Sequence, residues 1–345
     1  MNLKNTLTIW LKDNTTPLLL SVPLVVAALL AYLFGGTLIV RITTVLFINL
    51  MLVLGLQIFM GNSGILSFAH AGFMGIGAYA SVLFSMTTQA KAAALPDLYP
   101  ILREITLPFW ASLLIGALIA ALIAAIVSYP LMRLSDAAAV ITIFALLVII
   151  NVVLVHWSAV TNGPRTLFGV DFYTTLWTSV IYGVITIFLA FWFKESSLGL
   201  KIRASRDDSY AASAIGINII QVRWMAFVLS AFVAGFGGGL WAHFITSFSP
   251  YAFYLTTTFT ILAMLVVGGP LGVSGAVIGT VVVTFVHEGL RGIENWVNIN
   301  QLLPITLVGF TEISLSIILI LILILRPSGI LGGRELKWPI GKKKV

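Results

Sequence analysis

The sequence contains no cysteine and little charge. Of its 345 residues 9% are charged, whereas an ordinary soluble domain has roughly 25% charged residues. Without cysteine, the chain has no disulfide, no thiolate metal site and no cysteine nucleophile. With so few charges, a soluble protein of this length would not cover its surface with polar groups. The composition therefore excludes a cytosolic enzyme, a disordered chain and a nucleic-acid-binding domain.

Long apolar stretches take up most of the chain. Hydrophobic residues make up 59% of it, and the mean hydropathy is +1.08. A membrane-spanning helix needs about 20 apolar residues. The sequence has ten such stretches, at 17–36, 38–60, 68–86, 107–128, 137–156, 176–193, 222–243, 254–268, 273–288 and 304–325. Because these runs are long and do not alternate in polarity as barrel strands do, we predict an all-α polytopic membrane protein with about ten transmembrane helices.

The basic residues predict the orientation of these spans. The chain carries 19 Lys and Arg against 12 Asp and Glu. If the N-terminus lies inside, ten spans return the C-terminus to the same side, and 14 of the 19 basic residues then fall inside. Such an excess is typical of cytoplasmic segments. We therefore expect both termini and the basic loop at 194–223 to be cytoplasmic.

The first departure from plain apolar helix is the glycine-rich segment GNSGILSFAHAGFMGIGAY at 61–79. It places Asn62, Ser63, Ser67 and His70 at membrane depth. Glycine weakens a helix, and free backbone at this depth is tolerated only inside protein or beside a water-filled cavity. We expect these four side chains near the translocation pathway. Close packing of small residues alone is the alternative, and the sequence favours neither.

A second glycine-rich break, GGPLGVSGAVIG, lies at 268–279, where Pro270 forbids a continuous helix. Both breaks contain a G-x-S-G pattern, at 61–64 and at 272–275. Corresponding breaks in two halves of a chain are typical of the inverted repeats of transporters. The pattern hints at an inverted repeat in which these two segments correspond.

The loop at 194–223 is the longest and most charged of the internal segments. Within it, RDDSYAASAIGIN at 206–218 predicts a short amphipathic helix, because Asp207 and Asp208 suit a helix N-terminus and Gly216 can end it. Helices on a membrane surface usually carry bulky apolar side chains, whereas this face is mostly alanine. The small face favours insertion into a groove of a partner protein, with an interfacial helix as the alternative.

Several long motifs, in a fixed order, resemble the permease subunits of bacterial branched-chain amino-acid ABC importers, and most of all the second of their two permeases. The motifs are the segment 61–79, Arg133-Leu134 before the fifth span, the segment 206–218 with the span after it, LVVGGPLGVSGAVIGT, and the closing LRPSGILG. The likeness extends from about Phe47 to Gly333. It implies a single permease domain over 1–345, with 194–223 as its cytoplasmic coupling loop.

The resemblance also assigns residues. In that family the loop docks in a cleft of the ATPase, which implies a coupling role here for Arg206, Asp207, Asp208, Ala211, Ala212, Ala214 and Gly216. The family usually has an acidic residue between these alanines, where this chain has Ser213. After Arg133-Leu134 it often has glycine and an aromatic residue, where this chain has Ser135 and Asp136 followed by two alanines.

The resemblance further implies the partners and the solute. The partners are a second homologous permease chain, two ATP-binding subunits that carry ATP and Mg, and a periplasmic solute-binding protein, assembled in the lipid bilayer of a bacterial inner membrane. The chain itself would be no enzyme and would hold no cofactor, metal or nucleic acid. It would form half of a pathway for branched-chain or related hydrophobic amino acids, with urea, amides and aromatic acids as alternatives.

Two other classes of membrane protein compete with this interpretation. An ion-coupled secondary transporter needs acids inside the membrane, and the sequence offers Glu288 near a span end and Glu312 within the last span. We include Glu312 among the pathway residues and expect it to face the bundle or the pore. A membrane enzyme is disfavoured, because the four histidines lack metal-ligand spacing and no Ser/His/Asp set is evident.

Overall fold

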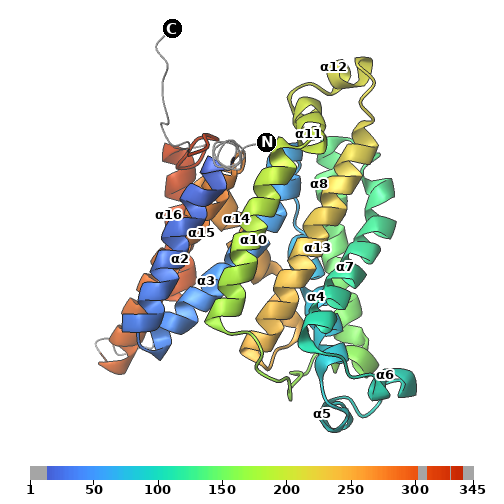
Figure 1. Cartoon of the computed structure of the whole chain (residues 1–345), viewed down its shortest axis with the longest axis vertical. Helices are drawn as coiled ribbons and strands as arrows, with labels where there is room; N and C mark the ends of the chain where they lie inside the picture. The colour runs from blue at the N-terminus through green and yellow to red at the C-terminus, as the bar shows by residue number, and fades with distance from the viewer. Residues whose placement is uncertain (1–13, 302–308, 327, 337–345) are drawn as a thin grey trace, which may run out of the picture.

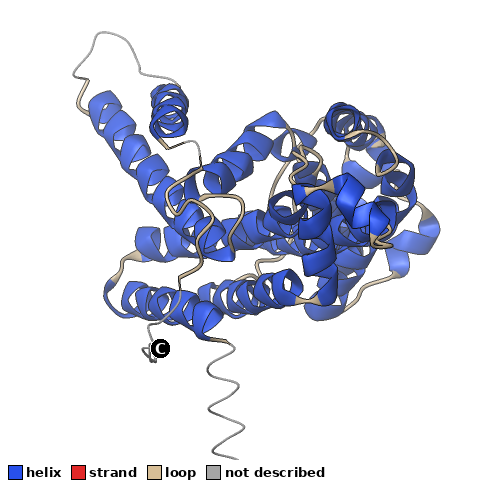
Figure 2. Ribbon diagram, turned by 90° about the horizontal axis from the view of Figure 1, so that it is seen from above, coloured by secondary structure: helices blue, strands red, loops and turns tan. Residues whose placement is uncertain are grey.

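The computed structural model describes residues 14–301, 309–326 and 328–336, and this part of the chain is helical and without strands (Figure 1). Figure 2 shows the same helices from above, joined by loops. Eight of them are long and apolar enough to cross a membrane. They are α2 (Thr15–Phe34), α3 (Thr37–Leu56) with the π-helix η1 (Gln57–Gly61), α7 (Phe109–Leu131), α8 (Asp136–His156), α10 (Leu176–Glu195), α13 (Ile219–Ile245), α14 (Leu255–Gly268) preceded by the 3-10 turn η2 (Pro250–Phe253), and α15 (Val273–Ile299).

The other two expected spans form shorter helices. α4 (His70–Ser85) and α16 (Phe310–Leu325) have 16 residues each. The prediction of an all-α polytopic membrane protein with about ten helices is thereby confirmed, although residues 304–308 of the last expected stretch lie outside the described residues. The connections contain α5 (Thr88–Ala94), α6 (Pro100–Glu104), α9 (Ser158–Thr161), α11 (Ser197–Asp207) and α12 (Ser209–Ala214).

Side-chain contacts identify the helix termini that lie together at each end of the bundle. Nε1 of Trp192, in the last turn of α10, donates to Oδ1 of Asn14 at the start of α2, and Lys194 pairs with Glu335 beyond α16. These contacts lie at the end that carries α11 and α12, the top of Figure 1, whereas α5 and α6 lie at the bottom. We call these the α12 end and the α5 end.

The third span is broken, as its glycines and polar residues predict. α3 and η1 run to Gly61 at the α12 end, residues 64–69 return into the bundle without regular structure, and α4 begins at His70. His70 contacts Ser230, which lies about 17 Å along α13 from its first residue, Ile219. The N-terminus of α4 therefore lies near the middle of a bilayer core about 30 Å thick.

A second break precedes α14, at 246–254. The chain leaves α13 at the α5 end, the ring centroid of Phe253 lies 5.9 Å from that of Tyr79 on α4, and α14 begins at Leu255. The rings of Phe68 and Phe259, which belong to the starts of the two half-helices, have centroids 6.3 Å apart. Two short helices thus begin close together inside the bundle and run to opposite ends of it.

The helix order is that of an inverted repeat, but the expected correspondence between the two glycine-rich segments is wrong. The series α3, α4, α7 and α8 runs in the opposite sense to α13, α14, α15 and α16, so that the break before α4 corresponds to the one before α14. The second glycine-rich segment is instead the turn between α14 and α15. A Cβ on Gly268 would overlap the Gly275 carbonyl there, so its glycines serve close helix packing.

Small residues also allow α4, α7 and α13 to pack closely against one another within the bundle. A Cβ on Gly77 of α4 would overlap the Gly235 carbonyl of α13, and one on Gly116 of α7 would lie 2.7 Å from the Gly77 carbonyl. Because no side chain separates these backbones, polar residues on α4 reach partners on α13 directly.

Candidate functional site

The polar centre of the bundle is a network of three hydrogen-bonded side chains: Ser67 just before α4, His70 on α4 and Ser230 on α13. Nδ1 of His70 lies 2.8 Å from Ser67 Oγ, and Nε2 lies 2.9 Å from Ser230 Oγ. Ser230 donates its own proton to the Phe227 carbonyl at 2.7 Å. An imidazole protonated at Nε2 satisfies all of these bonds, because it then donates to Ser230 and accepts from Ser67. All three side chains are buried.

Asn62 and Ser63 do not belong to this hydrogen-bonded network and lie at the end of η1. Nδ2 of Asn62 donates to the Ile58 carbonyl at 3.0 Å, and Ser63 Oγ accepts from the Ile65 backbone N–H at 3.2 Å. Gln57 lies beside them and is fully buried. Within the described residues, neither the Gln57 amide nor Oδ1 of Asn62 has a hydrogen-bond partner. These two amides retain unused donors and acceptors at the α12 end of the broken span.

Sequence reasoning missed Ser230, Gln57 and a second histidine network. His243 of α13 lies toward the α5 end, with Nε2 3.1 Å from Ser85 Oγ and 3.3 Å from Ser81 Oγ on α4. Its Nδ1 lies 3.2 Å from the Asp171 carbonyl. A polar residue within an apolar span was the available signal, but the contacts of His70 with Ser230 and of His243 with Ser81 and Ser85 join positions 158 to 162 apart along the chain.

Glu312 does not join the other predicted pathway residues. It lies in the first turn of α16, is exposed, and its carboxylate makes no hydrogen bond to another described residue. A nearby acid, Glu294, does form a hydrogen bond to the start of α16: its Oε2 accepts from the Thr311 backbone N–H at 2.9 Å. A helix N-terminus stabilises an acidic side chain by itself. The structure therefore gives Glu312 no inward contact, and its pathway role stays a prediction.

The loop at 194–223 contains two helices where one was expected. Arg206 and Asp207 end α11, and the backbone is extended at Asp208, so the short helix predicted within 206–218 is shorter than that range and runs from Ser209 to Ala214. Oδ1 of Asp208 accepts from the backbone N–H groups of Tyr210 and Ala211, both at 2.9 Å, and so caps α12. Gly216, at φ +83°, follows α12 as predicted.

The exposed face of α12 is not the expected alanine face. Ala212 is 2% exposed and packs inward, whereas Tyr210 is 88% and Ile215 76% exposed. Ala211 and Ala214 are exposed beside them. Arg206 also points inward, because its Nη1 donates to the Gly61 carbonyl at 2.9 Å. A six-residue helix packed on the bundle through one side cannot present all of its alanines outward, so Ala212 and Arg206 do not belong to a single exposed docking face.

A buried ion pair closes the α12 end. Lys194 pairs with Glu335, whose carboxylate also accepts from the backbone N–H groups of Val273 at 2.9 Å and Ser274 at 3.0 Å. Burial raises the pKa of Glu335, but Lys194 and the Ser274 hydrogen bonds outweigh it, so the pKa lies below the ordinary carboxyl value. This contact ties the segment after α16 to α10 and to the first turn of α15.

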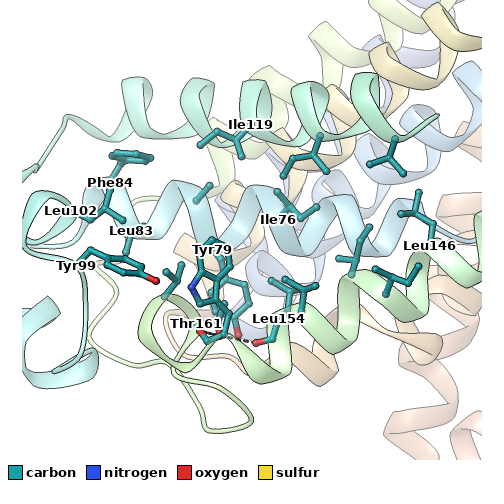
Figure 3. A pocket seen from close by; sticks show the side chains of 18 residues that line it. Ile76, Tyr79, Leu83, Phe84, Tyr99, Leu102, Ile119, Leu146, Leu154 and Thr161 are labelled. Atoms are coloured by element: carbon teal, nitrogen blue, oxygen red, sulfur yellow. Dashed lines mark hydrogen bonds between the residues drawn. The ribbon is translucent and has the colours of Figure 1, made fainter. Parts of the chain in front are cut away.

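An apolar cavity of about 420 Å³ lies between α4, α7 and α8 (Figure 3). Ile76, Leu83, Ile119, Leu146 and Leu154 point into it, and the hydroxyl of Thr161 at its edge donates to the Leu154 carbonyl at 2.6 Å. No charged residue lines it. Its walls therefore offer no charged partner for the ammonium or carboxylate of a free amino acid. In the part of the chain that the structure describes, no cluster of His, Asp or Glu is arranged to hold a metal.

Comparison with known proteins identifies the chain's relatives. Residues 38–325 match the family described as branched-chain amino acid transport system / permease component. The chain is 25% identical to the high-affinity branched-chain amino acid transport system permease protein LivM of Escherichia coli (strain K12), over 85% of this chain and 69% of that protein. It is 24% identical to the LivM protein of Salmonella typhimurium, with the same coverage.

Permeases named for other solutes are also similar. The nucleoside ABC transporter permease protein NupC of Lactococcus lactis is 27% identical over 55% of this chain and 62% of its own length. The guanosine ABC transporter permease protein NupQ of Bacillus subtilis is 26% identical over 64% of this chain and 72% of its own. No solved structure matches the chain significantly. Since the family match covers most of the polytopic helical bundle, the chain belongs to the family of permease components of branched-chain amino acid transport systems.

Proposed function

We propose that this chain forms half of the translocation pathway of an ATP-driven importer for branched-chain or related hydrophobic amino acids. The family match over 38–325 is the observation that carries the proposal. A second, homologous permease chain supplies the other half. Two ATP-binding subunits carry ATP and Mg, and a periplasmic solute-binding protein delivers the solute. The domain occupies 1–345, with 194–223 as its cytoplasmic coupling loop and both termini on the same side.

The mechanism is alternating access, with α12 as the docking element. Binding and hydrolysis of ATP in the partner subunits move α12, and the spans then open the pathway to one side at a time. The docking surface consists of exposed residues of α12 and its flanks, among them Tyr210, Ala211, Ala214 and Ile215. The broken spans before α4 and α14 supply the movable backbone, because residues 64–69 and 246–254 have few helical hydrogen bonds to lose.

The solute assignment rests on the LivM proteins, whose names specify branched-chain amino acids. Nucleosides are the second candidate, because two similar permeases are named for nucleoside and guanosine transport. An ion-coupled transporter is less well supported than either. Its two candidate acids lie on different helices: Glu288 is just past the midpoint of α15 with 26% of its side chain exposed, and Glu312 is exposed in the first turn of α16.

Reconstituted uptake tests both the class and the solute. The chain is assembled in vesicles with its partner permease, ATP-binding subunits and solute-binding protein, and uptake of labelled leucine and guanosine is measured with and without ATP. We expect uptake of leucine that requires ATP and persists when the proton and sodium gradients are dissipated. ATP-dependent uptake of guanosine alone would transfer the assignment to nucleosides, and uptake driven by an ion gradient without ATP would refute the ABC mechanism.

A further inference from the structure

Arg206 connects the loop at 194–223 to the broken third span. It lies in the last turn of α11, three positions before the first residue of α12, and 22% of its side chain is exposed. Its Nη1 donates to the Gly61 carbonyl at 2.9 Å, across 145 positions of sequence. Its Nε and Nη2 donate to Oδ1 of Asp207 at 3.1 and 2.9 Å, which fixes the plane of the guanidinium.

The Gly61 carbonyl is the point at which the regular helix gives way to the break. In a continuing α-helix, the backbone N–H of Ile65 would donate to this oxygen, but it donates to Ser63 Oγ at 3.2 Å. Carbonyl groups at a helix C-terminus carry a partial negative charge and favour a cation. Arg206 thus replaces the backbone donor that the break removes.

Gly64 makes room for this contact. Its φ is +77°, and a Cβ at this position would lie 2.9 Å from Cγ of Arg206. The stem of Arg206 therefore packs directly against the first residue of the irregular segment 64–69. That segment leads to Ser67 and His70. Arg206 therefore contacts the beginning of a short segment whose other end carries the polar centre.

On its N-terminal side, α12 is connected to the bundle through Arg206. Only Asp207 and the cap residue Asp208 separate them. The other end of α11 follows directly on α10, because Ser196 ends α10 and also caps α11, where its Oγ accepts from the Gly199 backbone N–H at 3.2 Å. A displacement of α12 therefore reaches Arg206 before it reaches α10.

We propose that Arg206 is a positioning residue that transmits movement of α12 to the broken span through the Gly61 carbonyl. The proposal rests on the proposed function, because α12 must move with a docked ATPase for the contact to act. Arg206 is then not part of the docking surface itself. Loss of its side chain separates ATP hydrolysis from transport without releasing the ATPase.

Variants of the full-length chain in the assembled transporter test this role. R206M removes every donor, R206K keeps the charge but loses the fork that Asp207 orients, and R203M removes the neighbouring α11 guanidinium, which contacts Lys194 and not the break. We measure ATPase co-purification, ATP hydrolysis and uptake. R206M should retain the ATPase yet lower uptake per ATP by about tenfold, the scale of a lost hydrogen bond to a charged group. R206K should be intermediate, and R203M should equal the wild type.

Two results would overturn the proposal. One is uptake per ATP in R206M equal to that in R203M, and the other is release of the ATPase from R206M, which would make Arg206 a docking residue. If R206M does not accumulate in the membrane, uptake per ATP in R206K is compared with that in R203M instead, and equal values would overturn the proposal. The proposed function fails in a different way, since the wild-type assembly would then show no ATP-dependent uptake.

Discussion

At the scale of single residues, His70 links a broken span to an unbroken one. Its two ring nitrogens contact Ser67, three positions before it, and Ser230, 160 positions after it. The ring also lies edge-on to Phe227, with centroids 5.7 Å apart. The histidine therefore holds the N-terminus of α4 at a defined depth along α13.

Replacement of His70 by alanine should impair transport before it impairs assembly. The change leaves two buried hydroxyl groups without their partner, which costs about 1–3 kcal/mol of stability for each such group. We expect uptake by H70A to fall severalfold while the chain still inserts and retains the ATPase. H156A is the control, because His156 is exposed at the end of α8 and, among the described residues, its ring makes a hydrogen bond only to the Val152 carbonyl. Unchanged uptake by H70A, S67A and S230A alike would leave close packing as the explanation of this segment.

Glu335 is the second residue whose environment predicts a measurable effect. Its side chain is 10% exposed, and that of its partner Lys194 is 6% exposed. E335Q should lower the free energy of unfolding by about 3–5 kcal/mol, because it leaves a buried ammonium without its counter-charge. E195Q, beside Lys194 but 53% exposed and 3.8 Å from Arg203, should change it by less than about 1 kcal/mol. Thermal unfolding in detergent measures both, and equal melting temperatures for the two variants would contradict the prediction.

The same ion pair predicts a pH dependence. The pKa of Glu335 is lower in the folded chain than the ordinary value of 4.5, so its stabilising contribution is complete above that value. It is lost as the pH falls through the folded pKa. The wild type should therefore lose more stability than E335Q when the pH is lowered through this range.

At the scale of elements, α12 is a small helix whose two faces differ. Asp208 caps it, Ala212 packs inward, and Tyr210 and Ile215 project from the other side. A bulky residue at 212 would disturb packing within this chain, so it would not report on a partner. The exposed side chains are the informative positions.

Charges on the exposed face of α12 should weaken ATPase docking. An interface that buries Tyr210 and Ile215 would leave an introduced carboxylate desolvated and unpaired. We expect Y210D and I215D to reduce co-purification of the ATPase by about tenfold or more, while Y99D, at an exposed tyrosine of the opposite, α5 end, should leave it unchanged. Equal retention of the ATPase by all three variants would exclude α12 as the contact.

At the scale of the whole molecule, the helix termini define two ends with different chemistry. The α12 end carries the basic loop and the Lys194–Glu335 pair, and the α5 end carries α5, α6 and the loop after α8. Both breaks direct a half-helix away from the interior, one toward each end. This arrangement presents irregular backbone to the interior from both sides, which suits a pathway that opens alternately.

Labelling of single cysteines should assign the ends to the two sides of the membrane. The chain has no cysteine of its own, so D97C and S213C each provide one reactive site, and both positions are exposed. An impermeant thiol reagent added to intact spheroplasts should modify D97C at the α5 end and not S213C at the α12 end, because the basic segments favour the cytoplasm. Permeabilised cells that produce the chain without its ATP-binding subunits, in which both should react, are the control. The reverse pattern in intact spheroplasts would refute the orientation.

The sequence by itself determined the membrane class, the approximate spans and the family. Hydropathy sums over about 20 neighbouring residues, so each span is visible without knowledge of what packs on it. The break at 61–69 was visible for the same reason, since glycine and polar residues act locally. Gly216 likewise marked the end of a helix through its own backbone preference.

Only the tertiary structure decided which residues meet. The break at 246–254 contains Pro250 but no glycine, and its sequence does not resemble that of the first break, so nothing local marks it as the counterpart. Ser230 is a polar residue in an apolar helix, and its contact with His70 depends on the close approach of α4 and α13, where Gly77 and Gly235 have no side chains. The inward direction of Arg206 and Ala212 follows from how α11 and α12 pack on the bundle. A pattern along the chain records which residues can form a helix, whereas the direction of each side chain is set by the close packing of segments far apart in sequence.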